Sequence, residues 1–365
     1  MKIADIRAVP LRIPFSTGGP TWQIRGKTWE TLDFVLVRVE MDDGTIGWGD
    51  AFAYHCHSAV AAAVTEMVAP QAIGQDATDI AALMRELQQR LHLFGRYGIT
   101  LFALSGLDIA LWDAAGKAAA LPLCRLLGGR VRDDIPGYSS LVNYGDPDVV
   151  AEKTKNSLDE GYSHVKLHET GEAEVAAARD AAGEGVPIMV DTNCPWIPEE
   201  ATRMAMAFSA YDIHWLEEPI FPPEDFSALA KLRHETGVPL AIGENASTAY
   251  QVRESLAAGA ADYVQPSVTK VGGVTEFRKI AVLAEAGGVQ LMPHAPYFGP
   301  GFLANLHLMA ATPNSGLVEW LYLEREACLF GGAIAPTDGK FAVPDGPGLG
   351  VDPDPDVMKD YAVAD

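Results

Sequence analysis

Short apolar runs recur from about residue 130 onward, at intervals mostly near 25 residues, and helical patterns lie between them. The eight runs are 135–141, 164–169, 187–193, 213–219, 239–245, 262–267, 289–295 and 316–322. The last of them has the weakest helical pattern after it. Strands that alternate with helices are typical of a parallel sheet. Eight such units predict an α/β fold, a (β/α)8 TIM-type barrel whose chemistry lies at the carboxyl ends of the strands.

The first part of the chain has a different pattern. Residues 33–41 and 45–52 read as two strands around an Asp-Asp-Gly turn, which predicts an antiparallel hairpin. Residues 99–120 carry apolar side chains at helical spacing and end before Pro122. The last segment is rich in Pro and Gly, and we expect it to return to the N-terminal domain. The predicted parts are an N-terminal α+β domain over 1–127, the barrel over 128–330 and a C-terminal segment over 331–365.

The chain is strongly acidic. Its 365 residues include 27 Lys and Arg against 49 Asp and Glu, a formal net charge of −22. A surface of this sign repels phosphate backbones and anionic lipid, so we expect neither nucleic acid nor a membrane as a partner. The four cysteines are far apart, and the N-terminus lacks the apolar core of a signal peptide. These features favour a cytoplasmic protein.

Three consecutive runs end on a carboxylate. Asp191 closes "IMVDTN", Glu217 closes "HWLEEP" and Glu244 closes "LAIGEN". The carboxyl ends of parallel barrel strands face one mouth, so these groups should lie within a few ångströms and repel one another. An all-oxygen set without Cys or His predicts Mg²⁺ rather than zinc. Ordinary surface carboxylates at loop starts are the alternative, and they explain one such residue better than three on neighbouring strands.

Other strand ends carry groups that could move a proton. Lys166 and His168 alternate in the second run, so both should point into the mouth. A lysine that faces a dication should have a lowered pKa and could act as a base. His294 ends the seventh run, across the barrel. A solvated lysine and a structural histidine are the alternatives. The set suits removal of a proton next to a carboxylate, because Mg²⁺ and ammonium groups stabilise the resulting enediolate.

These motifs, "VDTN", "WLEEP", "IGEN", "KVGG" and "MPHAP", resemble those of the enolase superfamily, and more closely its mandelate racemase-like branch, over nearly the whole chain. The resemblance implies an N-terminal α+β capping domain that closes over the barrel, and assembly into dimers or octamers. It also implies roles for individual residues. These are Asp191, Glu217 and Glu244 as Mg²⁺ ligands, Lys166, His168 and His294 as proton-transfer groups, Glu319 as a contact of the substrate carboxylate and Asn193 as its polar neighbour.

Two positions depart from the family pattern. The strand-two pair is commonly Lys-x-Lys, and here the second member is His168, so the identity of the base stays open. Members of the branch pair the strand-seven histidine with an Asp at the end of strand six, a position at which the muconate-lactonising branch has Lys. This chain has Ser267 there. Without that charge we expect His294 to be a weaker base, unless Glu319 or another carboxylate substitutes. Lys270, one turn further on, is a lesser candidate for a supporting role.

Two capping loops, residues 16–29 and 51–60, should line the substrate. Both are polar, which suits a hydroxylated anionic molecule. The candidate contacts are Trp22, Arg25, Lys27 and His55. We predict a Mg²⁺-dependent dehydratase, a lyase acting on an acid sugar as its small-molecule carboxylate substrate. Racemisation, epimerisation or lactone cycloisomerisation are alternatives, and Ser267 also leaves open a non-catalytic relative that binds metal or ligand.

Overall fold

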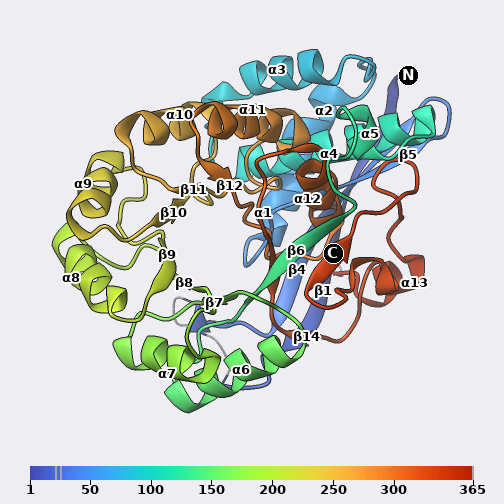
Figure 1. The fold of residues 1–365 in the computed structure, drawn as a ribbon. Coiled ribbons are helices and arrows are strands. Elements are labelled where there is room, and N and C mark those ends of the chain that lie inside the picture. The colour runs from blue at the N-terminus through green and yellow to red at the C-terminus, as the bar shows by residue number, and fades with distance from the viewer. Residues whose placement is uncertain (21–22, 25–26, 364–365) are drawn as a thin grey trace.

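Eight parallel strands close into a barrel in the computed structural model, which describes residues 1–20, 23–24 and 27–363 (Figure 1). The strands are β6 (Asp134–Ser140), β7 (Val165–Leu167), β8 (Ile188–Asp191), β9 (Ile213–Glu217), β10 (Leu240–Ile242), β11 (Tyr263–Val264), β12 (Gln290–Leu291) and β13 (Val318–Leu321). They hydrogen-bond in the order β12-β11-β10-β9-β8-β7-β6-β13. A parallel bridge between Leu291 and Ser315, just before β13, closes the ring. The predicted barrel is confirmed, and each predicted run overlaps one strand.

Helices follow the first seven barrel strands and form the outer ring of Figure 1. They are α6 (Pro147–Asp159), α7 (Glu172–Ala182), α8 (Pro198–Ser209), α9 (Phe226–Thr236), α10 (Ala249–Ala258), α11 (Gly273–Ala286) and α12 (Pro300–Ala311). Asp146, Asp225 and Thr248 start three of them by accepting a backbone N–H, as N-cap residues do. After β13 the chain continues into β14 (Glu324–Arg325) and the 3-10 turn η3 (Gly331–Ile334), where the sequence predicts the weakest helix.

An antiparallel sheet with the order β14-β1-β4-β5 forms the N-terminal domain. Its strands are β1 (Ile3–Ser16), β4 (Thr31–Met41) and β5 (Ile46–Ala51), and β2 (Gln23–Ile24) with β3 (Lys27–Thr28) makes a separate short hairpin. β4 and β5 pair around residues 42–44, so the predicted hairpin is confirmed. The helical elements are α1 (His57–Ala62), the π-helix η1 (Ala63–Val68), α2 (Ala69–Ala72), α3 (Ile80–Arg90), the 3-10 turn η2 (His92–Phe94), α4 (Ile99–Ala119) and α5 (Leu123–Leu126).

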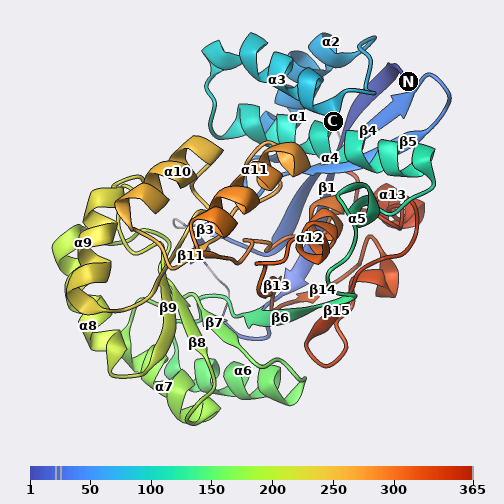
Figure 2. The same ribbon diagram turned by 45° about the horizontal axis from the view of Figure 1, so that its top comes forward.

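Helix α4 joins this sheet to the barrel. By length and composition it is the one helix of the described residues that could cross a membrane, but 78% of its apolar window is buried inside the protein. It packs directly on β5, since a Cβ atom placed on Gly49 would overlap the carbonyl oxygen of Gly106. On its other side, Asp108 accepts a 2.9 Å hydrogen bond from the backbone N–H of Thr275 in α11. Figure 2 shows the domain lying against the side of the barrel that carries α11 and α12.

The C-terminal segment contacts both parts of the molecule. Its strand β15 (Lys340–Ala342) pairs antiparallel with barrel strand β6. Beyond it, around α13 (Pro355–Asp360), the backbone of Arg12 donates to Tyr361 over 2.9 Å. The tail therefore lies along the edge of the N-terminal sheet as well as the barrel. The domain boundaries after residues 127 and 330 stay predictions.

The contact between β5 and α4 generates a prediction about stability. Gly49→Ala places a methyl group against the backbone of Gly106, which cannot yield as a flexible side chain does. We expect the free energy of unfolding, measured with urea, to fall by about 1–3 kcal/mol, as overpacked sites do. Gly332→Ala is the matched control, because its Cβ would meet open space and no φ restriction applies. Equal stability of the two variants would contradict the close approach.

Candidate active site at the carboxyl ends of the barrel strands

Three carboxylates converge where β8, β9 and β10 end. Asp191, Glu217 and Glu244 are buried, and one oxygen from each lies within 4.8 Å of the others. Register produces this arrangement, because Asp191 pairs directly with Glu217 across β8 and β9. Gly243, with φ of 131°, then turns the chain after β10, where a Cβ would press on the backbone of Gln265. Burial raises the pKa of Glu217 well above its usual value, and the nearby Asp191 charge adds to the effect.

Asp191 and Glu217 are held by neighbouring donors. Asn193 donates to Asp191 Oδ1 from both its backbone N–H and its side-chain Nδ2, each over 3.0 Å. Trp215 Nε1 donates to Glu217 Oε2 over 2.9 Å. Trp215 was not predicted from the sequence, although it lies two residues before Glu217 on one strand and therefore on the same face.

The Lys166 ammonium lies among carboxylates. Its Nζ is 2.8 Å from Glu319 Oε1, 2.9 Å from Glu217 Oε1 and 3.2 Å from Asp191 Oδ2, and all four side chains are fully buried. Burial disfavours the charged ammonium, but Glu217 and Glu319 outweigh it and raise the pKa of Lys166 well above its usual value. The lowered pKa expected from the sequence depends on a bound dication, whose positive charge acts in the opposite direction.

His168 and His294 contact different members of the carboxylate set. His168 lies between the Leu141 carbonyl oxygen, 2.6 Å from its Nδ1, and Asp191 Oδ2, 3.2 Å from its Nε2. Burial opposes its protonation, yet Asp191 outweighs burial and raises the pKa of His168. His294 Nε2 lies 2.7 Å from Glu244 Oε2. Burial opposes the ionisation of Glu244, but His294 and then Lys270 lower its pKa to about 2. Lys270, the lesser candidate, thus acts on a predicted metal ligand.

Ser267 stands where the family pattern has Asp, but its side chain makes no hydrogen bond with the His294 ring among the described residues. Its Oγ lies 3.1 Å from Tyr297 Oη, and that hydroxyl donates to the backbone carbonyl of His294 over 2.7 Å. Nδ1 of His294 is buried and has no hydrogen-bond partner among the described residues. No carboxylate of the described residues bonds to this nitrogen in place of the Asp of the family pattern. The weaker basicity expected for His294 stays a prediction.

Glu319 lies in the same cluster through β13. Its Oε1 accepts from Ser140 Oγ over 2.8 Å, and its Oε2 accepts from the backbone N–H of Ala295 over 3.0 Å. Burial opposes ionisation, but Lys166 and the imidazoles of His294 and His168 together outweigh it and lower the pKa of Glu319. Its contact with a substrate carboxylate stays a prediction. Ser140 was missed, although it lies near the end of the first predicted run.

Of the four contacts predicted in the capping loops, the structure describes the side chain of His55 alone. Trp22 and Arg25 lie outside the described residues, and Lys27 is described only as the start of β3. His55 is exposed, donates its backbone N–H to Asp33 and lies 6.2 Å from Trp29, ring to ring. None of the interactions described for His55 reaches the carboxylates. In the same loop, however, Tyr54 donates its hydroxyl to the carbonyl of Pro296, two residues beyond His294.

Comparison with known proteins agrees with this geometry. The family model "Mandelate racemase / muconate lactonizing enzyme, N-terminal domain" matches residues 12–128, and "Enolase C-terminal domain-like" matches residues 149–357. The D-galactarolactone cycloisomerase of Agrobacterium fabrum is 33% identical over 384 aligned positions that cover 100% of both chains. The arabinonate dehydratase of Saccharolobus solfataricus is 32% identical and covers 93% of each. A solved racemase from Streptomyces coelicolor A3(2) with bound magnesium is 30% identical, with a TM-score of 0.88 over 99% of this chain and 100% of that one.

The buried carboxylate set predicts the effect of one substitution on metal binding. Glu217→Gln removes one ligand charge but keeps an oxygen that can accept from Trp215. We expect Mg²⁺ affinity, measured by isothermal titration calorimetry, to fall by more than about 100-fold, since loss of even an outer partner of a metal site costs about 10–100-fold.

The far-ultraviolet circular dichroism spectrum of Glu217→Gln should match that of the wild type. Glu254→Gln, at an exposed carboxylate of α10, is the matched control and should bind Mg²⁺ as the wild type does. Wild-type affinity in Glu217→Gln would remove Glu217 from the ligand set.

Proposed function

Because the chain belongs to the mandelate racemase-like branch of the enolase superfamily, we propose that it is a Mg²⁺-dependent enzyme that removes the proton α to the carboxylate of an acid sugar. The observation that carries the proposal is the convergence of three buried carboxylates within 4.8 Å, flanked by Lys166 and His168 on one side and His294 on the other. The dehydratase and cycloisomerase relatives support acid-sugar chemistry.

The residues at the three strand ends fit Mg²⁺. The donor atoms are all carboxylate oxygens, which hard dications prefer. The raised pKa of Glu217 reflects a buried excess of negative charge that a dication would relieve. Held by Asp191, Glu217 and Glu244, Mg²⁺ would neutralise the charge that develops on the substrate carboxylate as the α proton leaves. The related racemase structure with bound magnesium supports this assignment.

The reaction needs two proton transfers, and different side chains of this protein can carry out each of them. We assign abstraction of the α proton to the pair Lys166 and His168 at the end of β7, whose side chains share one strand face. His294 lies at the far end of the ligand set, against Glu244 rather than Asp191. We assign to His294 the protonation of a leaving group from that side. Lys166 in its charged form also offsets the carboxylate charge around it.

Dehydration is the reaction we favour. The base takes the C2 proton, the C2–C3 double bond forms, and the C3–O bond breaks as His294 gives its proton to the departing hydroxyl. The enol then tautomerises to a 2-keto-3-deoxy acid. Among the described residues, Nδ1 of His294 has no hydrogen-bond partner. We take the absence of a carboxylate at that nitrogen as support for His294 as the proton donor rather than the base.

Cycloisomerisation is the second candidate, because the cycloisomerase relative is 33% identical over the whole chain. It starts with the same loss of an α proton. The reactions differ in what leaves C3, which is water in a dehydration and a ring oxygen in the opening of a cyclic substrate. Racemisation or epimerisation would instead return a proton to C2 from the opposite side.

Proton NMR in D₂O tests the reaction class directly, with Mg²⁺ and a panel of aldonic acids, aldaric acids and their lactones. We expect loss of the C2 and C3 signals and appearance of a 2-keto-3-deoxy acid. A ring-opened isomer formed from a lactone would select cycloisomerisation, and deuterium at C2 with inverted configuration would select epimerisation. Complete absence of C2 exchange across the panel would contradict the proposed proton abstraction.

A single substitution separates the two proton transfers. His294→Asn removes the proposed acid, so turnover should fall by about 100-fold or more, in the range of a general acid–base contribution. Exchange of the C2 proton with solvent, catalysed from β7, should survive. His234→Asn, on the exposed end of α9, is the matched control and should turn over normally. Normal turnover in His294→Asn would exclude His294 from the reaction.

A further inference from the structure

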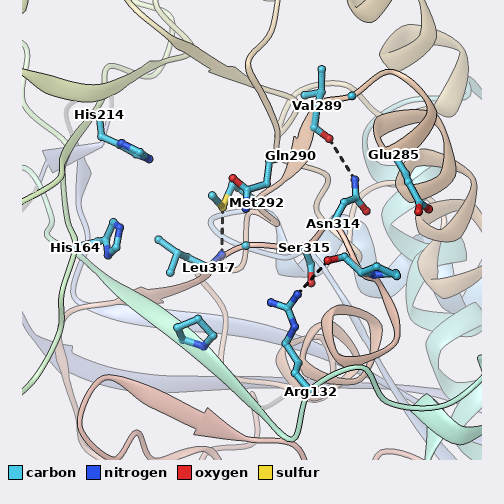
Figure 3. A pocket seen from close by; sticks show the side chains of 14 residues that line it. Arg132, His164, His214, Glu285, Val289, Gln290, Met292, Asn314, Ser315 and Leu317 are labelled. Carbon is cyan, nitrogen blue, oxygen red and sulfur yellow. Dashed lines mark hydrogen bonds between the residues drawn. The ribbon is translucent and has the colours of Figure 1, made fainter.

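The barrel has a cavity at the end opposite the candidate active site. Figure 3 shows the side chains that line it. This basal cavity measures about 740 Å³ and is lined by residues at or near the starts of barrel strands, among them Pro136, His164, His214, Gln290 and Leu317. Met292, which directly follows the short strand β12, also lines it. Pockets for small organic ligands commonly measure about 300–1,000 Å³. The basal cavity is therefore large enough for a small molecule.

A layer of side chains separates the basal cavity from the carboxylates. Tyr138, Met189, Trp215 and Met292 are buried together in the middle of the barrel. Trp215 packs against Tyr138 with ring centroids 5.9 Å apart, and against Tyr263 with ring centroids 4.9 Å apart. The proposed reaction uses nothing below this layer.

One wall of the basal cavity is a pair of imidazoles, and a β-bulge puts one of them there. In the pairing of β8 with β9, Ile188 faces Ile213 and Met189 faces Trp215, so His214 is an extra residue. Bulges redirect a side chain in this way. The rings of His164 and His214 lie 5.9 Å apart at 74°. Burial lowers the pKa of His164 to about 4 and also lowers that of His214, so both rings are uncharged near neutral pH.

The opposite side of the basal cavity carries a cation. Figure 3 shows the guanidinium of Arg132 directed into the space that the histidines border. It donates to the carbonyl of Pro313 over 3.2 Å, and it forms no ion pair with any carboxylate of the described chain. Glu285 lies on the exposed rim. A planar guanidinium with free donors matches a carboxylate in a two-pronged hydrogen bond.

We propose that the basal cavity binds a small monoanion with a flat apolar body, an aromatic or heteroaromatic carboxylate. Its ring would lie between the imidazole wall and the floor of Met292 and Leu317, since thioethers and aromatic rings attract one another. Its carboxylate would pair with Arg132. The uncharged histidines can pack against the ring, and Arg132 is the cation that binds the carboxylate.

Methyl NMR of the protein labelled with [methyl-¹³C]Met tests the proposal, with benzoate as the probe. Met292 lines the floor, so a bound ring should shift its methyl signal, which the Met292→Leu variant identifies among the 10 methionines. The benzoate concentration dependence of this shift gives the Kd. Arg132→Gln should raise that Kd at least about tenfold, because a hydrogen bond to a charged group contributes a factor of that order. Benzamide, with the same ring and no charge, should bind at least about tenfold more weakly.

Arg203→Gln, at an exposed arginine of α8, is the matched control and should bind benzoate as the wild type does. The methyl spectrum of Arg132→Gln without benzoate should overlay that of the wild type, which shows that its fold is intact. Three outcomes would each overturn the proposal. They are a Met292 methyl signal that does not shift when benzoate is added, equal affinity for benzamide and benzoate, and wild-type affinity for benzoate in a folded Arg132→Gln.

Discussion

Mutual repulsion among buried carboxylates is the constraint on which the mouth of this barrel depends. Asp191, Glu217, Glu244 and Glu319 are all buried, and the ammonium of Lys166 lies against three of them. Burial of unpaired charge is strongly unfavourable, so these groups persist only with compensation. Backbone and side-chain donors supply part of it, and the proposed Mg²⁺ would offset the negative charge that remains.

The two ends of the barrel have opposite electrostatic character. The carboxyl ends gather anionic groups, and the amino ends border a cavity with uncharged imidazoles and the Arg132 guanidinium, which pairs with no carboxylate of the described residues. Trp215 lies between them, with its N–H on Glu217 and its ring 5.3 Å from that of His214. A single rigid side chain thus contacts a proposed metal ligand on one side and packs against the cavity wall on the other.

Most of the fold and the carboxylate set could be predicted from the sequence, because both follow from local repetition. Apolar runs mark the strands, and a parallel barrel brings their ends together, so Asp191 and Glu217 needed no further information. The position of His214 could not be predicted. Side chains of a regular strand alternate between its two faces. Counted back from Glu217, this alternation predicts that Ile213 points into the barrel and His214 points away from it. The bulge reverses both, and Ile213 packs in the outer core instead.

Contacts between segments that are distant in the sequence could not be predicted from it either. Ser267 was recognisable as a departure, but its hydrogen bond to Tyr297 depends on how two loops approach each other. The hydroxyl of Tyr54 reaches the loop after β12 only through the docking of the two domains. Local patterns carry no information on such pairings, since the partners share neither a strand face nor a helix face.

The course of the tail has a consequence for biosynthesis. β14 pairs with the end of β1, the backbone of Arg12 bonds to Tyr361, and β15 pairs with β6. Each partner of the tail leaves the ribosome some 200 residues or more before the segment that pairs with it. Until then, one edge of the N-terminal sheet has unpaired backbone groups, and exposed edges of this kind associate with other chains. The nascent protein therefore passes through a long interval in which most of the barrel has been made while that edge still lacks its cover.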